Sequence, residues 1–375
     1  MPPSPVCCII PPYVFEEIEA NGTPAQSAAA RANLAAAVEL QELRSAAAGE
    51  PSAGVQAAGK ERIVYTAGNG TSLPGTPVRS EGGGPSGDAA VDEAYDGSGS
   101  TYDLYKDVFG RDSMDGSNMR LDSTVHYQTG YDNAFWNGKQ MVYGDGDEDL
   151  PVEQRLFNRF TIALDVIGHE LTHGVTQFSA GLVYLNQAGA LNEHFSDVFG
   201  SLVLQRTRGQ TAAEASWIIG SGLFTANVNG VGIRSMKAPG TAYDDPVIGK
   251  DRQPGHMDGY VTTVEDNGGV HINSGIPNRA FYQVATTLGG FSWEQAGAIW
   301  YRTLTDARLG SQSTFQEAAF LTFTVAGELH GTGSAQQTAV IDGWGVVGID
   351  ATLSGAPLPG GCLPLGSVLG RLRRT

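Results

Sequence analysis

The pentapeptide His169-Glu170-Leu171-Thr172-His173 predicts the centre of the fold. Two histidines four residues apart lie on one face of a helix, one turn above the other, and at this spacing both can bind a single zinc ion. Glu170 then lies beside the metal, where its carboxylate can take a proton from a water molecule. The pentapeptide therefore predicts a buried zinc-bearing helix and hydrolytic chemistry of the metalloprotease kind.

A second stretch, Asn192-Glu193-His194-Phe195-Ser196-Asp197, supplies what the first lacks. Glu193 is a candidate third zinc ligand, which leaves the fourth position of the ion open, as a catalytic site requires. Asp197 shares its helix face and is a candidate to accept the free ring N–H of a liganding histidine. The alternative interpretation is two charged helices whose histidines and carboxylates are solvated or paired.

The residues around the first stretch argue against that alternative. Apolar side chains recur at steps of three and four, a pattern typical of a helix packed into a core, at Phe157, Phe160, Leu164, Ile167, Leu171, Val175 and Phe178. Ile162 and Val166 make the opposite side largely apolar as well, so we expect a buried helical segment from Phe157 onwards. Burying histidines and carboxylates there without a metal would be costly.

Further motifs give the chain a resemblance to the thermolysin family of neutral zinc metalloendopeptidases, from about Tyr102 to about Asp350. The stretch Tyr131-Asp132-Asn133-Ala134-Phe135-Trp136-Asn137-Gly138 resembles the family's edge strand. The resemblance implies that Asn133 and Ala134 hold the substrate backbone as an added strand. Read without the family, the same stretch predicts an aromatic strand that ends in a turn.

The stretch from Asp266 to Gly275 resembles the family segment that carries a transition-state histidine. The resemblance implies that His271 and Tyr184 donate hydrogen bonds to the oxyanion and that Asp266 orients His271. Arg234 matches the arginine that binds a substrate carbonyl beyond the scissile bond, and a surface salt bridge is its alternative. A single histidine or tyrosine is more often a core residue, so these roles depend on the family motif.

The pocket for the residue after the scissile bond, the P1′ residue, is implied by the same resemblance. Its lining is apolar and bulky and comprises Phe157, Phe160, Val166 and Ile233. Such a pocket favours each buried methylene by about 0.8 kcal/mol, which predicts cleavage on the amino side of Leu, Phe, Ile or Val. If Phe160 narrows the pocket, Leu is preferred to Phe.

One catalytic zinc ion is the expected cofactor, and calcium is a possible second one. Asp165 matches a calcium ligand of the family, but the other matching positions hold Leu204, Ser216, Ser221 and Val231. Calcium binds six to eight oxygen atoms, several of them from carboxylates. We therefore expect the family's double calcium site to be absent.

Residues 1–50 resemble the short propeptide of the protealysin branch, with Pro11-Pro12-Tyr13 as its motif and two helices separated at Asn21-Gly22. The resemblance implies a latent precursor in which the propeptide is an intramolecular inhibitor. A further hypothesis is that a thiolate of Cys7 or Cys8 occupies the open zinc position. No secretory signal is visible, so we expect secretion by a non-classical route, with a cytoplasmic location as the alternative.

The expected fold is α+β, with a thermolysin-like two-lobe organisation. Residues 51–180 form a β-rich N-terminal lobe that ends in the central zinc-binding helix, residues 181–350 a mainly helical C-terminal lobe, and residues 351–375 a disordered tail. Within the helical lobe, Ser292 to Gln295 and Thr314 to Glu317 are candidate capping boxes.

Composition limits the partners. The net charge of −17 argues against nucleic acid, and no run of residues is long and apolar enough to span a membrane. Protein and peptide substrates and a monomeric chain are expected. Two alternatives stay open: a zinc aminopeptidase, which would need an acidic anchor for the substrate amine, and a catalytically silent zinc-stabilised binding protein.

Overall fold

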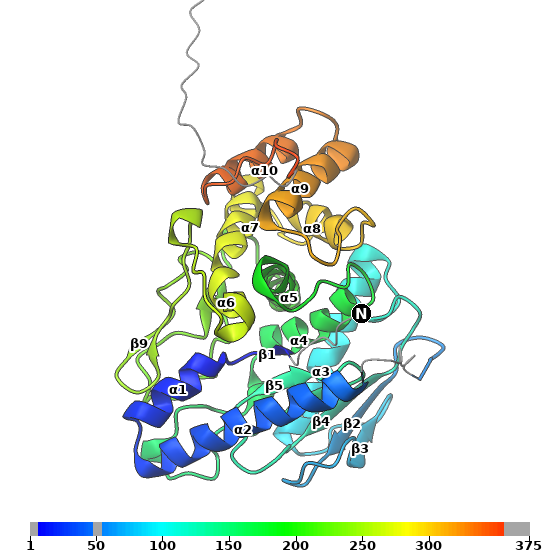
Figure 1. Cartoon of the computed structure of the whole chain (residues 1–375). Coiled ribbons are helices and arrows are strands. Elements are labelled where there is room, and N and C mark those ends of the chain that lie inside the picture. Colours follow the sequence, from blue (N-terminus) through cyan, green and yellow to red (C-terminus); the bar gives the residue numbers. More distant parts are fainter. Residues whose placement is uncertain (1–6, 48–54, 356–375) are drawn as a thin grey trace, which may run out of the picture.

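The computed structural model describes residues 7–47 and 55–355. Two lobes are visible in Figure 1, a lower one built on a sheet and an upper one built on helices, with helices α4 (Leu164–Gln177) and α5 (Asn186–Arg208) between them. Of the expected tail, residues 351–355 are described, with Ala351 fully buried, and residues 356–375 lie outside the described part, as does the expected propeptide boundary at residue 50. The α+β prediction with a central helix is confirmed.

One mixed sheet of six strands forms the frame of the N-terminal lobe, in the order β1-β5-β6-β4-β2-β3. Strands β2, β4 and β6 run parallel to one another, whereas β1, β3 and β5 pair antiparallel with their neighbours. The strands are β1 (Cys7–Cys8), β2 (Arg62–Thr66), β3 (Thr76–Ser80), β4 (Leu121–Val125), β5 (Ala134–Trp136) and β6 (Met141–Tyr143). The strand from the N-terminal segment thus completes the sheet beside β5.

Helices cover this sheet. Helix α3 (Ala89–Asp103) contacts β2, β4 and α4, and continues into a π-helical turn, Leu104–Val108. Asp88 caps α3 by accepting hydrogen bonds from the amides of Ala90 and Val91. The N-terminal helices α1 (Pro12–Asn21) and α2 (Pro24–Ala47), blue in Figure 1, pack against each other. Their separation after Asn21 agrees with the sequence prediction.

The zinc-binding helix begins later than the apolar pattern predicts. Helix α4 starts at Leu164, and only a short 3-10 turn, Phe160–Ile162, precedes it. The amides of Leu156 and Phe157 donate to Asp147 at 2.7 and 2.9 Å, and these bonds hold the chain in a non-helical course. The prediction of a helix from Phe157 was therefore wrong, because these tertiary hydrogen bonds outweigh the local apolar periodicity. Ile162, which the pattern placed on a buried helix face, is 42% exposed.

Two glycines let α4 and α5 approach closely. A Cβ atom at Gly200 would lie 2.3 Å from the carbonyl oxygen of Asp165 and 2.9 Å from the amide nitrogen of His169. A Cβ atom at Gly168 would lie 3.0 Å from the Cα atom of Gly200. Side chains on either glycine would therefore separate the two helices that carry the predicted zinc ligands.

The C-terminal lobe is mainly helical. Its helices are α6 (Asp266–Asn273), α7 (Gly275–Leu288), α8 (Ala296–Leu304), α9 (Phe315–His330) and α10 (Ala335–Gly345). Helix α7 contacts α5 and α10, and α9 contacts α8 and α10. Short strands β7 (Ile218–Ile219), β8 (Arg234–Ser235), β9 (Asp244–Asp245) and β10 (Gly249–Lys250) and 3-10 turns Val152–Gln154 and Met257–Gly259 lie in the connections. No helix in the described part of the chain is long and apolar enough to cross a membrane.

Candidate metal centre and substrate cleft

Three side chains from α4 and α5 converge on one point. The Nε2 atoms of His169 and His173 lie 3.1 Å apart, and oxygens of Glu193 lie 3.5 and 3.4 Å from them. A tetrahedral zinc ion with bonds of roughly 2.0–2.1 Å separates its ligand atoms by about 3.3 Å. The three predicted ligands therefore form one face of a tetrahedron of the right size for zinc.

Glu193 has the electrostatic state that a ligand needs. It is fully buried, and its Oε2 atom accepts no hydrogen bond from the described residues, although buried carboxylate oxygens are normally satisfied. Burial alone would raise its pKa, but His271, His169, His173 and Arg234 outweigh burial and hold the pKa below its ordinary value. A buried anionic oxygen without a donor fits a cation at the centre of the three ligand atoms.

Both histidines are fixed by partners at their other ring nitrogen. His169 Nδ1 lies 2.8 Å from Asp197, and His173 Nδ1 lies 2.8 Å from Asn192. Burial opposes ionisation of Asp197, but Arg234 and His169 hold its pKa well below the usual range. These contacts aim both Nε2 atoms at the centre. The predicted place of Asp197 agrees with the geometry, whereas the sequence reading did not identify Asn192.

Glu170 lies on the same helix turn, and its carboxylate is within 4.8 Å of the two histidine nitrogens. The amide of Trp136, on β5, donates to its Oε2 atom at 3.1 Å. Glu170 is fully buried. The edge strand therefore sets the position of this carboxylate next to the metal ligands.

His271 follows a left-handed turn at the start of α6. Asp266, Asn267, Gly268 and Gly269 have φ values of 50°, 51°, 84° and 76°. The turn brings the carboxylate of Asp266 to 2.5 Å from Nδ1 of His271 and 2.8 Å from its amide nitrogen. Burial opposes protonation of His271, but Asp266 and Glu193 raise its pKa to about 9.

Tyr184 completes this side of the site. Its hydroxyl donates to Glu193 and lies 3.0 Å from Nε2 of His271. The two groups that the resemblance assigns to the oxyanion are thus brought together next to the metal ligands. Both side chains are buried.

The N-terminal segment occupies the cleft between β5 and the metal centre. Cys7 and Cys8 pair antiparallel with Trp136 and Phe135. The amide of Ile9 donates to the carbonyl of Ala134 at 3.3 Å, and the segment thereby extends the sheet at the edge predicted to hold substrate.

The next residues of the segment contact the remaining predicted substrate-binding groups. The amide of Ile10 donates to the side chain of Asn133 at 3.0 Å. Arg234 donates to the carbonyl of Ile9 at 3.1 Å. The surface salt bridge was the wrong alternative for Arg234, because this guanidinium is buried and also makes two bonds to Asp197 at 2.9 and 2.8 Å.

The backbone carbonyl of Cys8, and not its side chain, points to the predicted site. Its carbonyl oxygen lies 2.9 Å from Nε2 of His271, whereas its side chain packs with Tyr127, Tyr131 and Phe135. The hypothesis of a Cys8 thiolate on zinc is therefore wrong, because the strand pairing turns the side chain into the aromatic cluster. The side chain of Cys7 lies outside the described residues.

The predicted P1′ pocket is formed in the core. Phe157, Phe160, Val166 and Ile233 are each at most 2% exposed, and all belong to the core cluster that contains Ile9. Ile9 is fully buried. Ile9 and the four predicted pocket residues are therefore all parts of the main hydrophobic core.

Asp165, the acidic residue at the predicted calcium position, is held by the backbone. Its carboxylate accepts hydrogen bonds from the amides of Gly220 at 2.9 Å and Val166 at 3.0 Å. Burial raises its pKa to about 6 despite these bonds. Leu204 is buried and Val231 is exposed, and neither side chain offers an oxygen ligand. Absence of the double calcium site stays a prediction.

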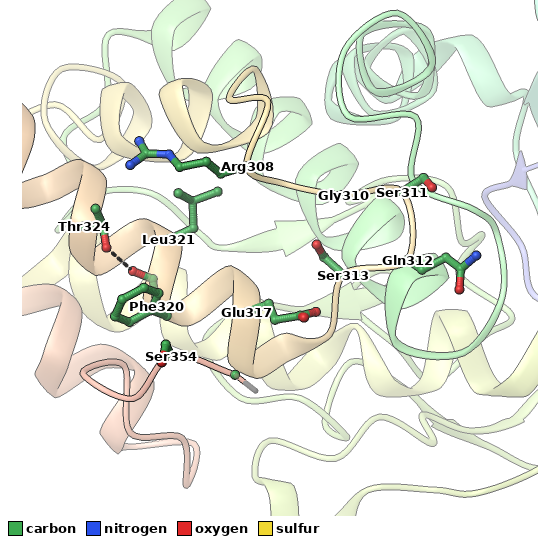
Figure 2. A pocket seen from close by; sticks show the side chains of 11 residues that line it. Arg308, Gly310, Ser311, Gln312, Ser313, Glu317, Phe320, Leu321, Thr324 and Ser354 are labelled. Atoms are coloured by element: carbon green, nitrogen blue, oxygen red, sulfur yellow. Dashed lines mark hydrogen bonds between the residues drawn. The ribbon is translucent and has the colours of Figure 1, made fainter. Parts of the chain in front are cut away.

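The cavity that Figure 2 shows lies elsewhere, in the helical lobe. It has a volume of about 720 Å³ and lies between the loop from Arg308 to Ser313, helix α9 and the residues Ser354 and Gly355. None of the predicted site residues lines it. The cavity therefore does not mark the predicted active site, which is located by the arrangement of the metal ligands. Residues 8–10 lie against that site.

The comparisons with known proteins agree with this geometry. Residues 53–177 match the family described as thermolysin metallopeptidase, catalytic domain, and residues 180–349 match thermolysin metallopeptidase, alpha-helical domain. The chain belongs to the thermolysin family of metallopeptidases and is a zinc-dependent metalloendopeptidase.

Among its relatives are precursors and extracellular enzymes. The chain is 51% identical over 314 residues to the extracellular metalloprotease of Pectobacterium carotovorum subsp. carotovorum, covering 83% of this chain and 88% of that one. It is 52% identical over 290 residues to protease PrtS of Photorhabdus sp. (strain Az29), covering 77% and 76%. The precursor of protealysin from Serratia proteamaculans superposes with a TM-score of 0.83 at 48% identity, over 92% of this chain and 99% of that chain. The prediction of a protealysin-like member is confirmed.

Proposed function

We propose that this metalloendopeptidase is made as a latent precursor whose own N-terminal segment inhibits it from within the substrate cleft. The observation that carries the proposal is the backbone pairing of residues 8–10. Their amides and carbonyls bond to Ala134, Asn133, Arg234 and His271, the groups predicted to bind substrate. A substrate that competes for the same groups is excluded while the segment is bound.

In the mature enzyme, these residues have distinct chemical roles. His169, His173 and Glu193 would hold a zinc ion, which would supply Lewis-acid activation of the carbonyl and of the attacking water. Glu170 takes a proton from the attacking water and passes it to the leaving amine. His271 and Tyr184 donate hydrogen bonds to the oxyanion, and Asp266 keeps His271 oriented and protonated.

Specificity is for a bulky hydrophobic P1′ residue. The four pocket residues have no charged atom to pair with a polar substrate side chain, and the burial of Ile9 supports an aliphatic occupant. Cleavage of a peptide library is expected to show Leu, Ile, Val or Phe at P1′. A preference for charged P1′ residues would exclude this assignment of the pocket.

Latency is tested by adding the inhibitor back. A separately made peptide of residues 1–50 should inhibit the mature enzyme in an azocasein assay. The same peptide with Ile9→Asp should inhibit at least about 100-fold more weakly, because a carboxylate must be buried in an apolar pocket. Ile9→Leu is the matched control and should inhibit as the original does. Equal inhibition by the Asp and Leu peptides would contradict a cleft-bound inhibitor.

The enzyme acts outside the cell and as a monomer in this proposal. Relatives named extracellular metalloprotease support the location. All three metal ligands, the cleft and the inhibitory segment belong to one chain, so a monomer suffices. Activity found in the lysate and absent from the culture medium would contradict the location, and sedimentation as a dimer would contradict the monomer.

The aminopeptidase alternative fits less well. An aminopeptidase needs an acidic group that binds the free amine of the residue before the scissile bond, and this group closes the cleft on that side. Here Cys7 pairs with Trp136 on that side, so the strand continues. The silent binding protein is also disfavoured, because Glu170 and His271 are held in place beside the ligands.

A further inference from the structure

The N-terminal segment runs antiparallel to β5, the strand that is predicted to hold the substrate. Strand β1 is antiparallel to β5, and the chain proceeds from Cys8 at His271 to Ile9 at Arg234. Each contact matches one role of the catalytic cleft: the Cys8 carbonyl lies at the oxyanion histidine, and the Ile9 carbonyl lies at the arginine for the primed side. The amide bond between these two carbonyls is therefore the one presented to the metal centre.

We propose that the Cys8–Ile9 bond is a self-cleavage site of the precursor, and that the cleaved segment stays bound and keeps the enzyme latent. This inference rests on the proposed function, because it requires both the catalytic roles and the cleft-bound inhibitor. It adds a specific bond and an order of events, with cleavage inside the cleft preceding release of the segment.

The residues flanking this bond have the character that the site selects. Ile9 follows the bond and has a fully buried aliphatic side chain, the type of residue expected at P1′. The small side chain of Cys8 packs in a cluster with Tyr127, Tyr131 and Phe135. The amide of Ile9, which becomes the leaving amine, is held by the carbonyl of Ala134 at 3.3 Å.

The reaction is a hydrolysis and needs only water. The water oxygen joins the carbonyl carbon of Cys8, and Glu170 takes up the proton that the water loses. The C–N bond then breaks, and Glu170 passes the proton to the nitrogen of Ile9. The products are residues 1–8 with a new carboxylate and a chain that begins with the free amine of Ile9.

The described residues after the bond make many contacts with the catalytic lobes, and these contacts would keep the enzyme latent after cleavage. On the far side of the bond, α1 buries Tyr13, Val14, Phe15 and Ile18. Glu17 pairs with Arg252 at 2.8 Å.

Helix α2 anchors the segment further. Gln26 donates to the carbonyl of Gln154 at 2.7 Å. The side chain of Asn33 bonds to both the amide and the carboxylate of Asp132. On the near side, strand β1 contributes two residues. The cleaved chain therefore keeps Ile9, Ile10 and both helices on the enzyme, as a bound product.

The test follows the mass and the N-terminal sequence of the purified full chain with zinc, in parallel with azocasein hydrolysis. The wild-type chain is expected to lose residues 1–8 and begin at Ile9 while azocasein hydrolysis stays at the precursor level. The rate of this loss should not change over a 100-fold dilution, because bond and site lie in one molecule. Glu170→Ala should retain the bond.

Two further variants probe the pocket. Ile9→Asp should slow cleavage at this bond on the order of 100-fold, whereas Ile9→Leu should keep it. If the Ile9→Asp variant does not fold, the mature enzyme is incubated instead with a synthetic peptide of residues 5–12. We expect the enzyme to cleave this peptide between Cys8 and Ile9.

Different results separate this inference from the proposed function. A precursor that matures with Cys8–Ile9 intact, or a cleavage rate that rises with protein concentration, would overturn the inference. Azocasein hydrolysis by the mature enzyme tests the proposed function on its own and would be unaffected by that outcome.

Discussion

At the scale of single residues, Asp197 connects several groups of the site through hydrogen bonds. It accepts hydrogen bonds from His169, from two nitrogens of Arg234 and from Asn278. The sequence predicted its link to a histidine, because the residue shares a helix face with Glu193. It could not predict the second link, since Arg234 comes from a distant strand. One carboxylate thus positions both a predicted metal ligand and a guanidinium predicted to bind substrate.

Asp197→Asn should weaken zinc binding by about 10–100-fold, because the amide cannot accept from both His169 and Arg234 as the carboxylate does. Competition with a chromophoric chelator measures the affinity. Asp245→Asn is the control, since this buried carboxylate accepts only from the backbone amides of Asn229, Val247 and Ile248. Equal zinc affinity in the two variants would refute the positioning role of Asp197.

His126 gives a pH dependence away from the metal. Hydrogen bonds with Asp145 and Asp88 raise its pKa to about 9 against the opposing effect of burial. Because the pKa is raised on folding, protonation of this ring stabilises the fold. The stabilisation is complete at pH values below the pKa of the unfolded chain, near 6.5, and is lost as the pH rises through 9.

His126→Gln should therefore lower the free energy of unfolding by about 2 kcal/mol at pH 6, allowing for solvent screening, and by little at pH 10. Urea unfolding in a Glu170→Ala background avoids autolysis and measures both values. A loss of stability that is the same at both pH values would show that the charged ring is not responsible.

At the scale of elements, the helices were predicted better than their ends. The capping box at Thr314 and Glu317 is confirmed at the start of α9. The one proposed at Ser292 and Gln295 is wrong, because α8 begins at Ala296 and Ser292 is buried. Capping signals are local, so they succeed where the chain is free to follow them and fail where packing fixes a side chain elsewhere.

The crossing of α4 and α5 makes an element-scale prediction. Gly200→Ala places a methyl group 2.3 Å from a backbone oxygen of α4, so it should destabilise the fold by about 1–3 kcal/mol and weaken zinc binding. Gly345→Ala is the control, because no atom lies within 4 Å of its added Cβ. Thermal unfolding and zinc titration compare the variants. Equal behaviour of the two would show that the close crossing is not required.

At the scale of the whole molecule, the sequence predicted the two lobes, the metal ligands and the two N-terminal helices. The resemblance implied an inhibitory N-terminal segment, but the sequence did not predict that this segment pairs with β5. Its partners, such as Asn133 and Arg234, are more than 100 residues away, and no periodicity encodes a pairing of that range. Only the folded chain reveals that Ile9 and Ile10 contact the residues predicted to bind substrate.

The anchor of α2 gives a prediction at this scale. Asn33→Leu has a similar volume but removes the bonds to Gly130 and Asp132, leaving buried polar groups without partners. The segment should dissociate more easily, and activation should be about tenfold faster in a time course of azocasein hydrolysis. Arg31→Ala, at an exposed ion pair with Glu19, should activate at the wild-type rate. Unchanged activation in Asn33→Leu would contradict the anchoring role.

The most direct measurement is azocasein hydrolysis by the purified full chain before and after loss of its first ~50 residues, with zinc content determined in each form. We expect about one zinc per chain in both forms, activity only after the loss, and a 10²–10⁴-fold lower activity in processed Glu170→Ala that still holds zinc. A processed chain that binds zinc and cleaves nothing, or a full chain as active as the processed one, would contradict this expectation.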